Sequence, residues 1–388
     1  MPFKEQTMSE QRLNMVKEII SGAQSLSSIC RKYSISRPTA YLWVKRYKNG
    51  YSMEAFSRAP KSRPSQTNIE SERVILEERN EHPDWGARKL KAHIERETGV
   101  CFPAASTIHA ILQRNNQITA EATQAATPYK RFVRERPNDM WQCDFKGNFG
   151  LKLGGRCYPL VVMDDHSRFK LSFRAFPGER LELVKAEFIL LFRENGLPYS
   201  LLSDNGNPWG SSTLGYTLFE IFLMNLDVLP IHSRPFHPQT QGKVERLNRT
   251  IESGVIKRFG PFDDLSSAQI CFDAFRNEYN NIRPHESLKY FVPSDVYRKS
   301  ERLMPETIKS WEYSSDYMVY RVSGGRLTYK GIRIYISEGF DKEYVGIKQS
   351  DNIDIIEIHY RNFLIAEYHL LNKCFVTKRI KRVNISKR

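Results

Sequence analysis

The sequence predicts a multidomain protein with two all-α domains at the N-terminus, a central α/β core and a small β-barrel near the C-terminus. The chain has 388 residues, more than one compact domain usually holds. Apolar residues recur at helical spacing over the first 115 residues and mostly at strand spacing after about residue 140. A hydrophobic content of 40% is enough for buried cores and excludes a globally disordered chain.

Residues 9–50 are expected to form three short helices with a helix-turn-helix arrangement. Ser36 can cap the third helix, and the first turn of that helix tolerates Pro38. We expect Ala40, Val44 and Tyr47 to face inward. The side chains that then point outward are Arg37, Thr39, Tyr41 and Lys45. Cationic and hydroxyl groups on such a helix favour binding in the DNA major groove, and a plain three-helix bundle is the alternative.

Two linkers flank a second helical domain. Residues 51–67 form a basic linker that carries Pro and Ser, and Arg63 is its candidate contact to a phosphate backbone. The second helical (helix-turn-helix-like) domain is expected at residues 68–115, where Gly99 can end the middle helix. The charge of this domain is nearly balanced, so it could either bind DNA or act as a protein–protein spacer. Residues 116–136 form the second linker.

The α/β core is expected at residues 137–300. Strands at 140–149, 156–164 and 169–175 are followed by alternating helices and strands, which is the pattern of an α/β sheet. Short strands punctuated by glycine then predict the small β-barrel at residues 310–377, with a β-sandwich as the alternative. Residues 378–388 carry six basic and no acidic side chains and are expected to be an unstructured phosphate-binding tail.

The basic surplus lies at the two ends of the chain. Of the net charge of +15, residues 1–70 supply +7 (12 basic, 5 acidic) and residues 301–388 supply +5 (16 basic, 11 acidic). Cationic terminal modules suit a protein that binds a polyanion, and simple solubility charge is the alternative. The six cysteines never have CxxC spacing, which predicts reduced intracellular thiols and argues against structural zinc. The chain has no apolar run of membrane-spanning length.

Three carboxylates stand out by their positions. Asp144 lies in a strand on the face opposite Trp141 and Cys143, where a charge needs a partner. Asp204 ends a strand, at the edge where α/β sheets form their sites. Glu245 lies in the first turn of a helix. Taken singly, each acid could be ion-paired or a helix cap, and Asp204 could belong to a simple turn.

Together these motifs resemble the integrase catalytic core of the DDE transposases of bacterial insertion sequences, relatives of retroviral integrases. The resemblance covers nearly the whole chain and is strongest over residues 137–300. Its residues are Trp141-x-x-Asp144, Ser203-Asp204-Asn205-Gly206, His237-Pro238-Gln239-Thr240-Gln241-Gly242-Lys243-Val244-Glu245-Arg246, Met163–Arg168 and Asn280–His285.

The resemblance implies an RNase H-like core, with a mixed five-stranded sheet and helices, and Asp144, Asp204 and Glu245 as catalytic, metal-binding residues. Two Mg²⁺ ions, or Mn²⁺, would assist phosphodiester hydrolysis and strand transfer. The 40 residues between Asp204 and Glu245 exceed the spacing of many members, and Glu252 is the weaker alternative third acid.

Other charged residues of the core have separate expected roles. Lys243, Arg246 and Arg249 step by three along the helix of Glu245, and we expect this ridge to contact DNA, with a solubility surface as the alternative. Asp164 and Asp165 are expected to shape a hairpin or pair with Arg168.

The expected function is that of a metal-dependent transposase acting in the bacterial cytoplasm at the nucleoid. Its partners would be the terminal inverted repeats of its element, target DNA, and a second copy in a homodimer or larger synaptic complex. A DNA-binding repressor with an inactive core and a nuclease without strand transfer are the alternatives.

Overall fold

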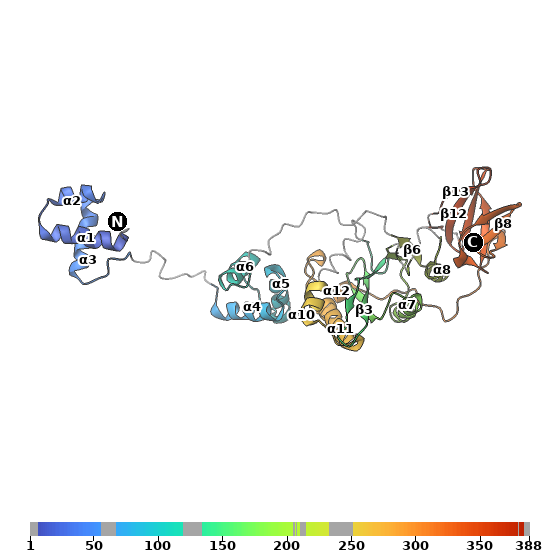
Figure 1. Ribbon diagram of the computed structural model, residues 1–388, viewed down its shortest axis with the longest axis horizontal. Coiled ribbons are helices and arrows are strands. Elements are labelled where there is room, and N and C mark those ends of the chain that lie inside the picture. The colour runs from blue at the N-terminus through green and yellow to red at the C-terminus, as the bar shows by residue number, and fades with distance from the viewer. Residues whose placement is uncertain are drawn as a thin grey trace. The chain divides into compact units, whose positions relative to one another are not determined.

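The computed structural model describes residues 7–55, 67–118, 134–204, 206, 208–209, 215–232, 251–378 and 380–383 (Figure 1). The chain forms two compact units, Met1–Thr67 and Asn68–Arg388, and each is described by itself. Among the described residues, no helix combines the length and the apolar character needed to cross a bilayer.

The first unit is a three-helix domain of α1 (Met8–Ser21), α2 (Leu26–Lys32) and α3 (Arg37–Lys48). The Ser36 hydroxyl caps α3 by accepting the Thr39 backbone N–H, as predicted. Ala40 is fully buried, and Trp43 and Val44 pack against the small core. The expectation for Tyr47 was wrong: it is 39% exposed because it lies in the last turn of α3, while Trp43 covers the core.

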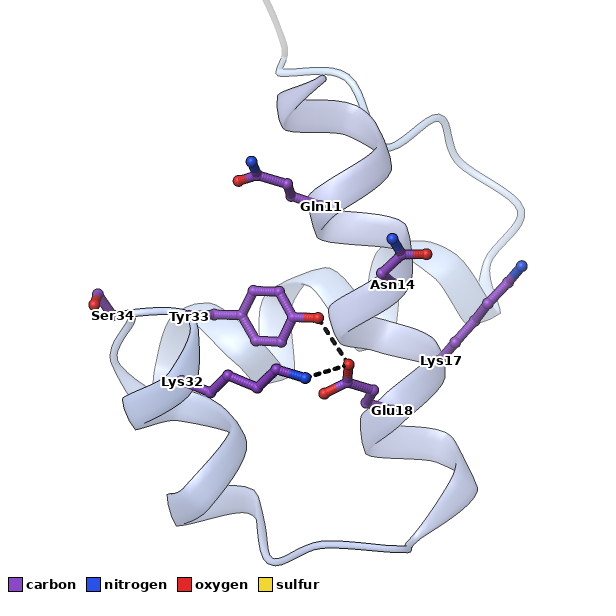
Figure 2. Close-up of a pocket in the computed structure, with 7 residues that line it drawn as sticks. All are labelled: Gln11, Asn14, Lys17, Glu18, Lys32, Tyr33 and Ser34. Atoms are coloured by element: carbon purple, nitrogen blue, oxygen red, sulfur yellow. Dashed lines mark hydrogen bonds and ion pairs between the residues drawn. The ribbon is translucent and has the colours of Figure 1, made fainter. Parts of the chain in front are cut away.

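A hollow of about 680 Å³ lies between α1 and α2 (Figure 2). At its centre, the Glu18 carboxylate accepts hydrogen bonds from Lys32 Nζ at 2.7 Å and from the Tyr33 hydroxyl at 2.9 Å. These two bonds lower the pKa of Glu18. The same bonds tie α1 to α2, so Glu18 has a structural role in this domain.

The second unit begins with α4 (Ile69–Glu81), α5 (Ala87–Thr98) and α6 (Ala105–Arg114). Gly99 ends α5 in the left-handed conformation with φ 67°, as predicted. Apolar side chains from all three helices and the α4–α5 turn form one buried cluster. Its members are Ile75, Trp85, Leu90, Ile94, Ile108, Ile111 and Leu112.

A mixed sheet forms the middle of the second unit. Its strands are β1 (Trp141–Phe145), β2 (Phe149–Gly150), β3 (Arg156–Asp164), β4 (Lys170–Phe176), β5 (Ser200–Ser203) and β6 (Leu229–His232). β3 pairs antiparallel with β1, β2 and β4, whereas β1–β5 and β5–β6 are parallel. The expected mixed sheet is therefore present, with the two-residue β2 added to five longer strands.

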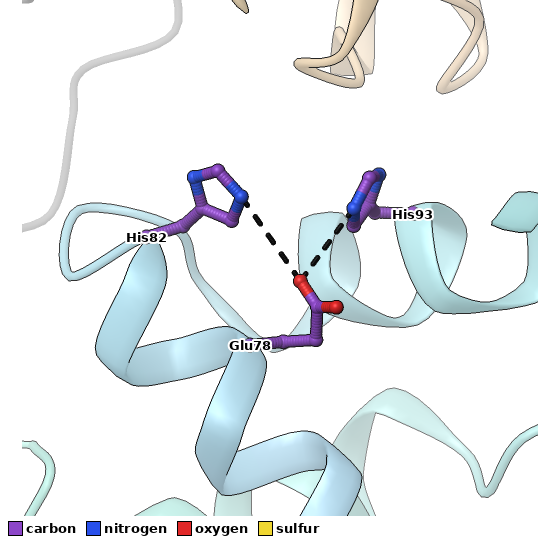
Figure 3. Close-up of side chains that lie close together, drawn as sticks. All are labelled: Glu78, His82 and His93. Carbon is purple, nitrogen blue, oxygen red and sulfur yellow. Dashed lines mark ion pairs between the residues drawn. The ribbon is translucent and has the colours of Figure 1, made fainter.

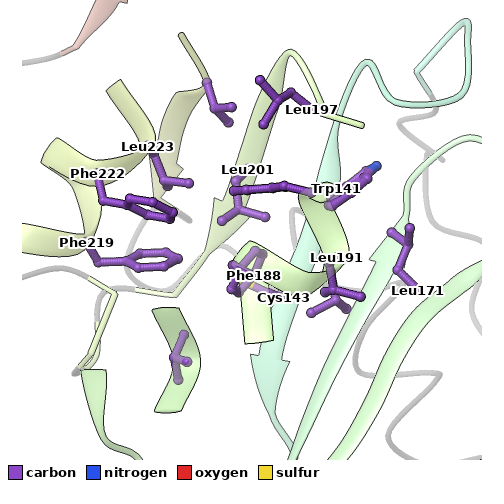
Figure 4. Packing of buried hydrophobic residues seen from close by; sticks show 14 of the residues in the cluster. Trp141, Cys143, Leu171, Phe188, Leu191, Leu197, Leu201, Phe219, Phe222 and Leu223 are labelled. Carbon is purple, nitrogen blue, oxygen red and sulfur yellow. The ribbon is translucent and has the colours of Figure 1, made fainter. Parts of the chain in front are cut away.

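Helices cover both faces of this sheet. On one face, α7 (Leu181–Asn195) and α8 (Leu218–Asn225) pack over Trp141, Cys143 and Leu201 (Figure 4). On the other face, α11 (Leu265–Asn281) lies against β3 and β4, and Phe272 stacks on Phe173 at 3.9 Å. The shorter helical segments are η2 (Glu252–Ile256, a π-helical turn), α10 (Lys257–Phe259), η3 (Glu286–Leu288) and α12 (Pro293–Val296).

The C-terminal region contains an open sheet, so the expected barrel is not found among the described residues. The sheet has the order β13-β12-β11-β10-β7, β14 pairs with β12, and β8 and β9 form a separate hairpin. The bounds are β7 (Met318–Arg321), β8 (Arg326–Tyr329), β9 (Ile332–Tyr335), η4 (Glu338–Phe340), β10 (Tyr344–Gln349), β11 (Ile355–Tyr360), β12 (Phe363–His369), β13 (Cys374–Thr377) and β14 (Lys381–Arg382).

Other elements cover the apolar face of this open C-terminal sheet. Leu327 and Ile334 of the hairpin pack on it, and so do Ile221 and Met224 of α8. The Tyr216 hydroxyl also donates a hydrogen bond to the backbone oxygen of Ile365. The sheet and the central core are therefore joined by shared apolar packing.

The expectation of an unstructured basic tail was wrong for part of the tail. Lys381 and Arg382 form β14, and Arg382 Nη1 lies 2.7 Å from Asp227 Oδ2. Because strand pairing and an ion pair already occupy this segment, Arg382 is directed into the protein. Residues 379 and 384–388 lie outside the described residues.

We predict that Phe272→Ala destabilises the second unit by about 3–5 kcal/mol, because it removes a fully buried ring stacked on Phe173. Urea unfolding followed by tryptophan fluorescence measures the change. Ile270→Ala on the same helix is the control, since Ile270 is 71% exposed and its truncation should change stability little. Equal losses in both variants would contradict the packing described for α11.

Candidate active site

Two of the three predicted acids lie at the ends of neighbouring parallel strands. In the β1–β5 pair, Trp141 lies opposite Leu201 and Gln142 opposite Leu202. Continued by two residues, this register sets Asp144 against Asp204. Both residues are half-buried. The chain therefore brings two carboxylates together at the carboxyl edge of the sheet, where open α/β sheets usually bind ligands.

Asp144 occupies the face predicted from alternation. Trp141 and Cys143 point into the cluster beneath α7 and α8. Asp144 shares the opposite face with Val161, its cross-strand partner, which belongs to the cluster beneath α11. Burial first, and then the negative charges of Asp144 and Asp204, raise the pKa of the Cys143 thiol well above its usual value. Both carboxylates therefore act electrostatically on one buried thiol.

Hydrogen bonds hold Asp204 in place at both its side chain and its backbone. The Gly206 N–H donates to Asp204 Oδ1 at 3.0 Å. The backbone oxygen of Asp204 lies 2.8 Å from His232 Nδ1. His232 ends β6, directly beside Ser203 in the parallel register.

A buried carboxylate fixes the His232 ring from its other side. His232 Nε2 lies 2.9 Å from Oε1 of Glu220, whose other oxygen accepts the Thr217 backbone N–H at 2.7 Å. Burial alone would lower the pKa of His232, but the hydrogen bond and charge of Glu220 outweigh it and raise that pKa. The chain Thr217–Glu220–His232 therefore supports the strand end that carries Asp204.

Glu179 is a further acid close enough to Asp204 to be affected by its charge. Burial and the charge of Asp204 raise the pKa of Glu179, which precedes α7. Glu179, Glu220 and His232 are not among the site residues predicted from the sequence. His232 could have been found from the rule that led to Asp204, since it also ends a strand of the predicted core.

The remaining predicted core residues lie outside the described part of the chain. They are Glu245, Lys243, Arg246 and Arg249, and the linker residue Arg63 is outside it as well. The described chain resumes at Ile251, which packs with Val255 in the cluster beneath α11, on the Asp144 face of the sheet.

Asp164 and Asp165 shape the turn after β3, which was one of their two expected roles. Both are fully buried. The Asp164 carboxylate accepts hydrogen bonds from the Asn138 and Ser167 backbone N–H groups at 2.7 and 2.8 Å. Asp165 Oδ2 accepts the Arg134 backbone N–H at 2.8 Å. These partners occupy the carboxylates within the protein.

The expected DNA-contacting residues of α3 have different surroundings. Tyr41 is 62% exposed, and Lys45 is also exposed. Thr39 Oγ1 lies 2.9 Å from Ser36 Oγ in the helix cap, and the Arg37 guanidinium donates to Ser27 Oγ. Tyr41 and Lys45 are thus exposed, whereas the polar groups of Thr39 and Arg37 bond to neighbouring serine side chains.

Comparisons with domain families agree with an N-terminal helical region and a central α/β core. The helix-turn-helix domain family matches residues 11–60, and the homeodomain-like domain family matches residues 39–112. Two integrase core domain families match residues 134–238 and 226–293. The chain therefore carries an integrase core domain that follows helix-turn-helix domains.

Similar proteins include a transposase and a protein of an insertion element. The transposase of transposon Tn552 from Staphylococcus aureus is 25% identical over 339 residues, covering 78% of this chain and 66% of that protein. A protein of insertion element IS407 from Burkholderia multivorans is 25% identical, over 58% of this chain and 79% of its own length. The chain is thus similar to a transposase and to an insertion-element protein over more than half of its length.

More distant similarity extends to retroviral proteins. The Gag-Pol polyprotein of baboon endogenous virus is 34% identical over 44% of this chain, which spans 10% of that polyprotein. The chain spans less than two thirds of both this polyprotein and the Tn552 transposase. The HTLV-2 integrase catalytic core domain, solved with magnesium, aligns at 19% identity and a TM-score of 0.34, covering 42% of this chain and 99% of that chain.

We predict that His232→Gln lowers the free energy of unfolding by about 1–3 kcal/mol, because it leaves the buried Glu220 carboxylate without its partner. Glu220→Gln should cost less, since the amide oxygen can still accept a hydrogen bond from His232. Urea unfolding of the three proteins measures both losses. A His232→Gln protein as stable as the parent would show that the ring does not support the strand end.

Proposed function

We propose that this protein is a DNA transposase that binds the ends of its own element, cuts the DNA there and joins the ends to target DNA. The observation that best supports the proposal is the pair Asp144 and Asp204, at the ends of neighbouring parallel strands on one face of an integrase-type core. Glu245 is the proposed third acid. The similarity to the Tn552 transposase and to a protein of insertion element IS407 supports the same activity.

The two described acids fit divalent metal ions. Carboxylate oxygens are hard ligands of the kind that Mg²⁺ and Mn²⁺ prefer, and the two side chains are only half-buried. Asp144, Asp204 and Glu245 would hold two Mg²⁺ ions. When bound, such ions stabilise the attacking and leaving oxygens of an in-line displacement at phosphorus. Three carboxylates without metal would repel DNA, so the ions would also be needed for the substrate to enter.

The proposed reaction has two displacements at phosphorus. In the first, water forms a bond to a phosphorus at the element's end while the bond to the 3′ oxygen breaks, which leaves a 3′-hydroxyl. In the second, that hydroxyl forms a bond to a target phosphorus while the bond from this phosphorus to its 3′ oxygen breaks, which leaves a 3′-hydroxyl on the target strand. The protein's part is to hold the acids in place, and Gly206, His232 and Glu220 position Asp204 for this purpose.

The helix-turn-helix domains would recognise the terminal repeats. In the first unit, α3 presents Tyr41 and Lys45 to solvent and would enter the major groove. Arg37, Thr39 and Arg63 of the same region, with Lys243, Arg246 and Arg249 of the core, are the further proposed DNA contacts. Because an element has two ends, we propose a homodimer or larger synaptic complex, acting in the bacterial cytoplasm at the nucleoid.

A repressor with an inactive core is the less favoured alternative. Such a protein would have no reason to retain both Asp144 and Asp204, or the buried network that supports Asp204. A nuclease without strand transfer would retain them, and it differs from a transposase in forming no joined product.

We predict that Asp204→Asn, Asp144→Asn and Glu245→Gln each reduce Mg²⁺-dependent nicking and joining at least about a thousandfold, since a lost metal ligand costs several kcal/mol of transition-state stabilisation. The assay uses a plasmid that carries the element's two ends. Asp263→Asn, an exposed acid of the same core, and Glu252→Gln should remain active. Full activity in Asp204→Asn would refute the assignment, and an inactive Glu252→Gln would move the third acid to that position.

We predict that Lys45→Ala weakens binding to terminal-repeat DNA and lowers the slope of log affinity against log salt by about one, as expected for one lost phosphate contact. Fluorescence anisotropy at several salt concentrations measures both quantities. Lys17→Ala is the matched control, because Lys17 is an exposed lysine on α1 of the same domain. Equal effects of the two substitutions would mean that α3 is not the recognition helix.

A further inference from the structure

Outside the core, three side chains bring together atoms that metals bind. Glu78 lies in the last turn of α4, His82 follows at the end of that helix, and His93 projects from α5 (Figure 3). Glu78 Oε2 lies 4.0 Å from His82 Nε2 and 3.5 Å from His93 Nε2. One ligand atom of each residue lies within 4.8 Å of the other two. The three groups therefore converge on one point.

This cluster leaves buried polar atoms unsatisfied. Within the described part of the chain, Glu78 Oε2 and His93 Nδ1 are buried and have no hydrogen-bond partner. A buried carboxylate oxygen without a hydrogen-bond partner is costly. A cation bound between the three residues would remove that cost at Glu78 Oε2.

The donor set selects the kind of cation. One carboxylate and two imidazoles match a common zinc ligand set, whereas Mg²⁺ prefers oxygen ligands alone. With zinc–ligand bonds of about 2.0–2.1 Å, tetrahedral ligand atoms lie about 3.3 Å apart. The observed separations of 3.5 and 4.0 Å, and the upper limit of 4.8 Å for all three atoms, are longer than this. Side-chain movements of up to about an ångström would therefore bring the three atoms to zinc-binding distance.

A second carboxylate orients one of the two imidazoles. His82 Nδ1 lies 3.3 Å from Glu278 Oε1, and the His82 ring stacks on the buried Trp85 with 3.8 Å between ring centroids. With its proton on Nδ1, the nitrogen that lies next to Glu278, His82 would have the Nε2 lone pair available on the side of Glu78. Carboxylates that fix metal-bound imidazoles in this way are a regular feature of zinc sites.

We propose that Glu78, His82 and His93 bind one divalent transition-metal ion, best matched by zinc, and that Glu278 positions His82. The site uses α4 and α5, and Glu278 belongs to α11 of the core. It is separate from Asp144 and Asp204 and does not depend on the proposed cleavage activity. The bound ion would fasten the helical region to the core, beside the ion pairs Arg283–Asp84 at 2.8 Å and Arg96–Asp295 at 2.6 Å.

The test is a zinc titration of the full chain after treatment with chelator, against a chromophoric competitor. The parent protein is expected to bind one zinc ion per chain. His82→Gln and His93→Gln should each lose at least about a hundredfold in affinity, and Glu278→Gln about tenfold. His109→Gln is the matched control, because His109 is an exposed histidine on α6 of the same region. Cobalt substitution should give the visible absorption bands of a four-coordinate site.

Zinc binding and cleavage can fail separately. The double variant Asp144→Asn, Asp204→Asn should keep its zinc while losing cleavage. The proposal is overturned if the parent protein binds less than one zinc ion per chain, or if His82→Gln and His93→Gln bind zinc as it does. If those two variants fail to fold, as judged by circular dichroism, the parent stoichiometry and the affinity of Glu278→Gln still decide the question.

Discussion

The parallel pairing of β1 with β5 is the constraint on which the candidate active site depends. Asp144 and Asp204 are 60 positions apart in the sequence, and only a parallel arrangement sets the carboxyl ends of their strands at the same edge. A slip of one residue would turn Trp141 and Cys143 out of the cluster beneath α7 and α8. The large apolar side chains of the core therefore keep the two acids in register.

The support of Asp204 reaches further than its own strand. His232 belongs to β6 and Glu220 to α8, so the acid is held through two other elements of the core. α8 in turn is packed on both sides. Phe219 and Phe222 point into the central core, while Ile221 and Met224 point into the C-terminal sheet. The position of Asp204 thus depends on packing that extends to the C-terminal sheet.

Much of the fold follows from local sequence patterns. The remaining parts are set by pairing between segments that lie far apart in the sequence. Alternation placed Asp144 on the correct face, and the cap residues Ser36 and Gly99 marked helix ends correctly. Period-two patterns reveal strands but do not say which edges meet, so the C-terminal sheet was mistaken for a barrel. His232 has a local signal because it ends a strand, but its pairing with Glu220 depends on a contact between elements, and so does the cluster of Glu78 with His93. No local pattern contains such contacts.

The double packing of α8 has a consequence for how the protein can vary. A substitution on one side of this eight-residue helix shifts the surface offered to the other side, because both are buried. The central core and the C-terminal sheet must therefore change in concert during evolution. Exchanging the C-terminal sheet for that of a relative would succeed only if the matching face of α8 were transferred with it.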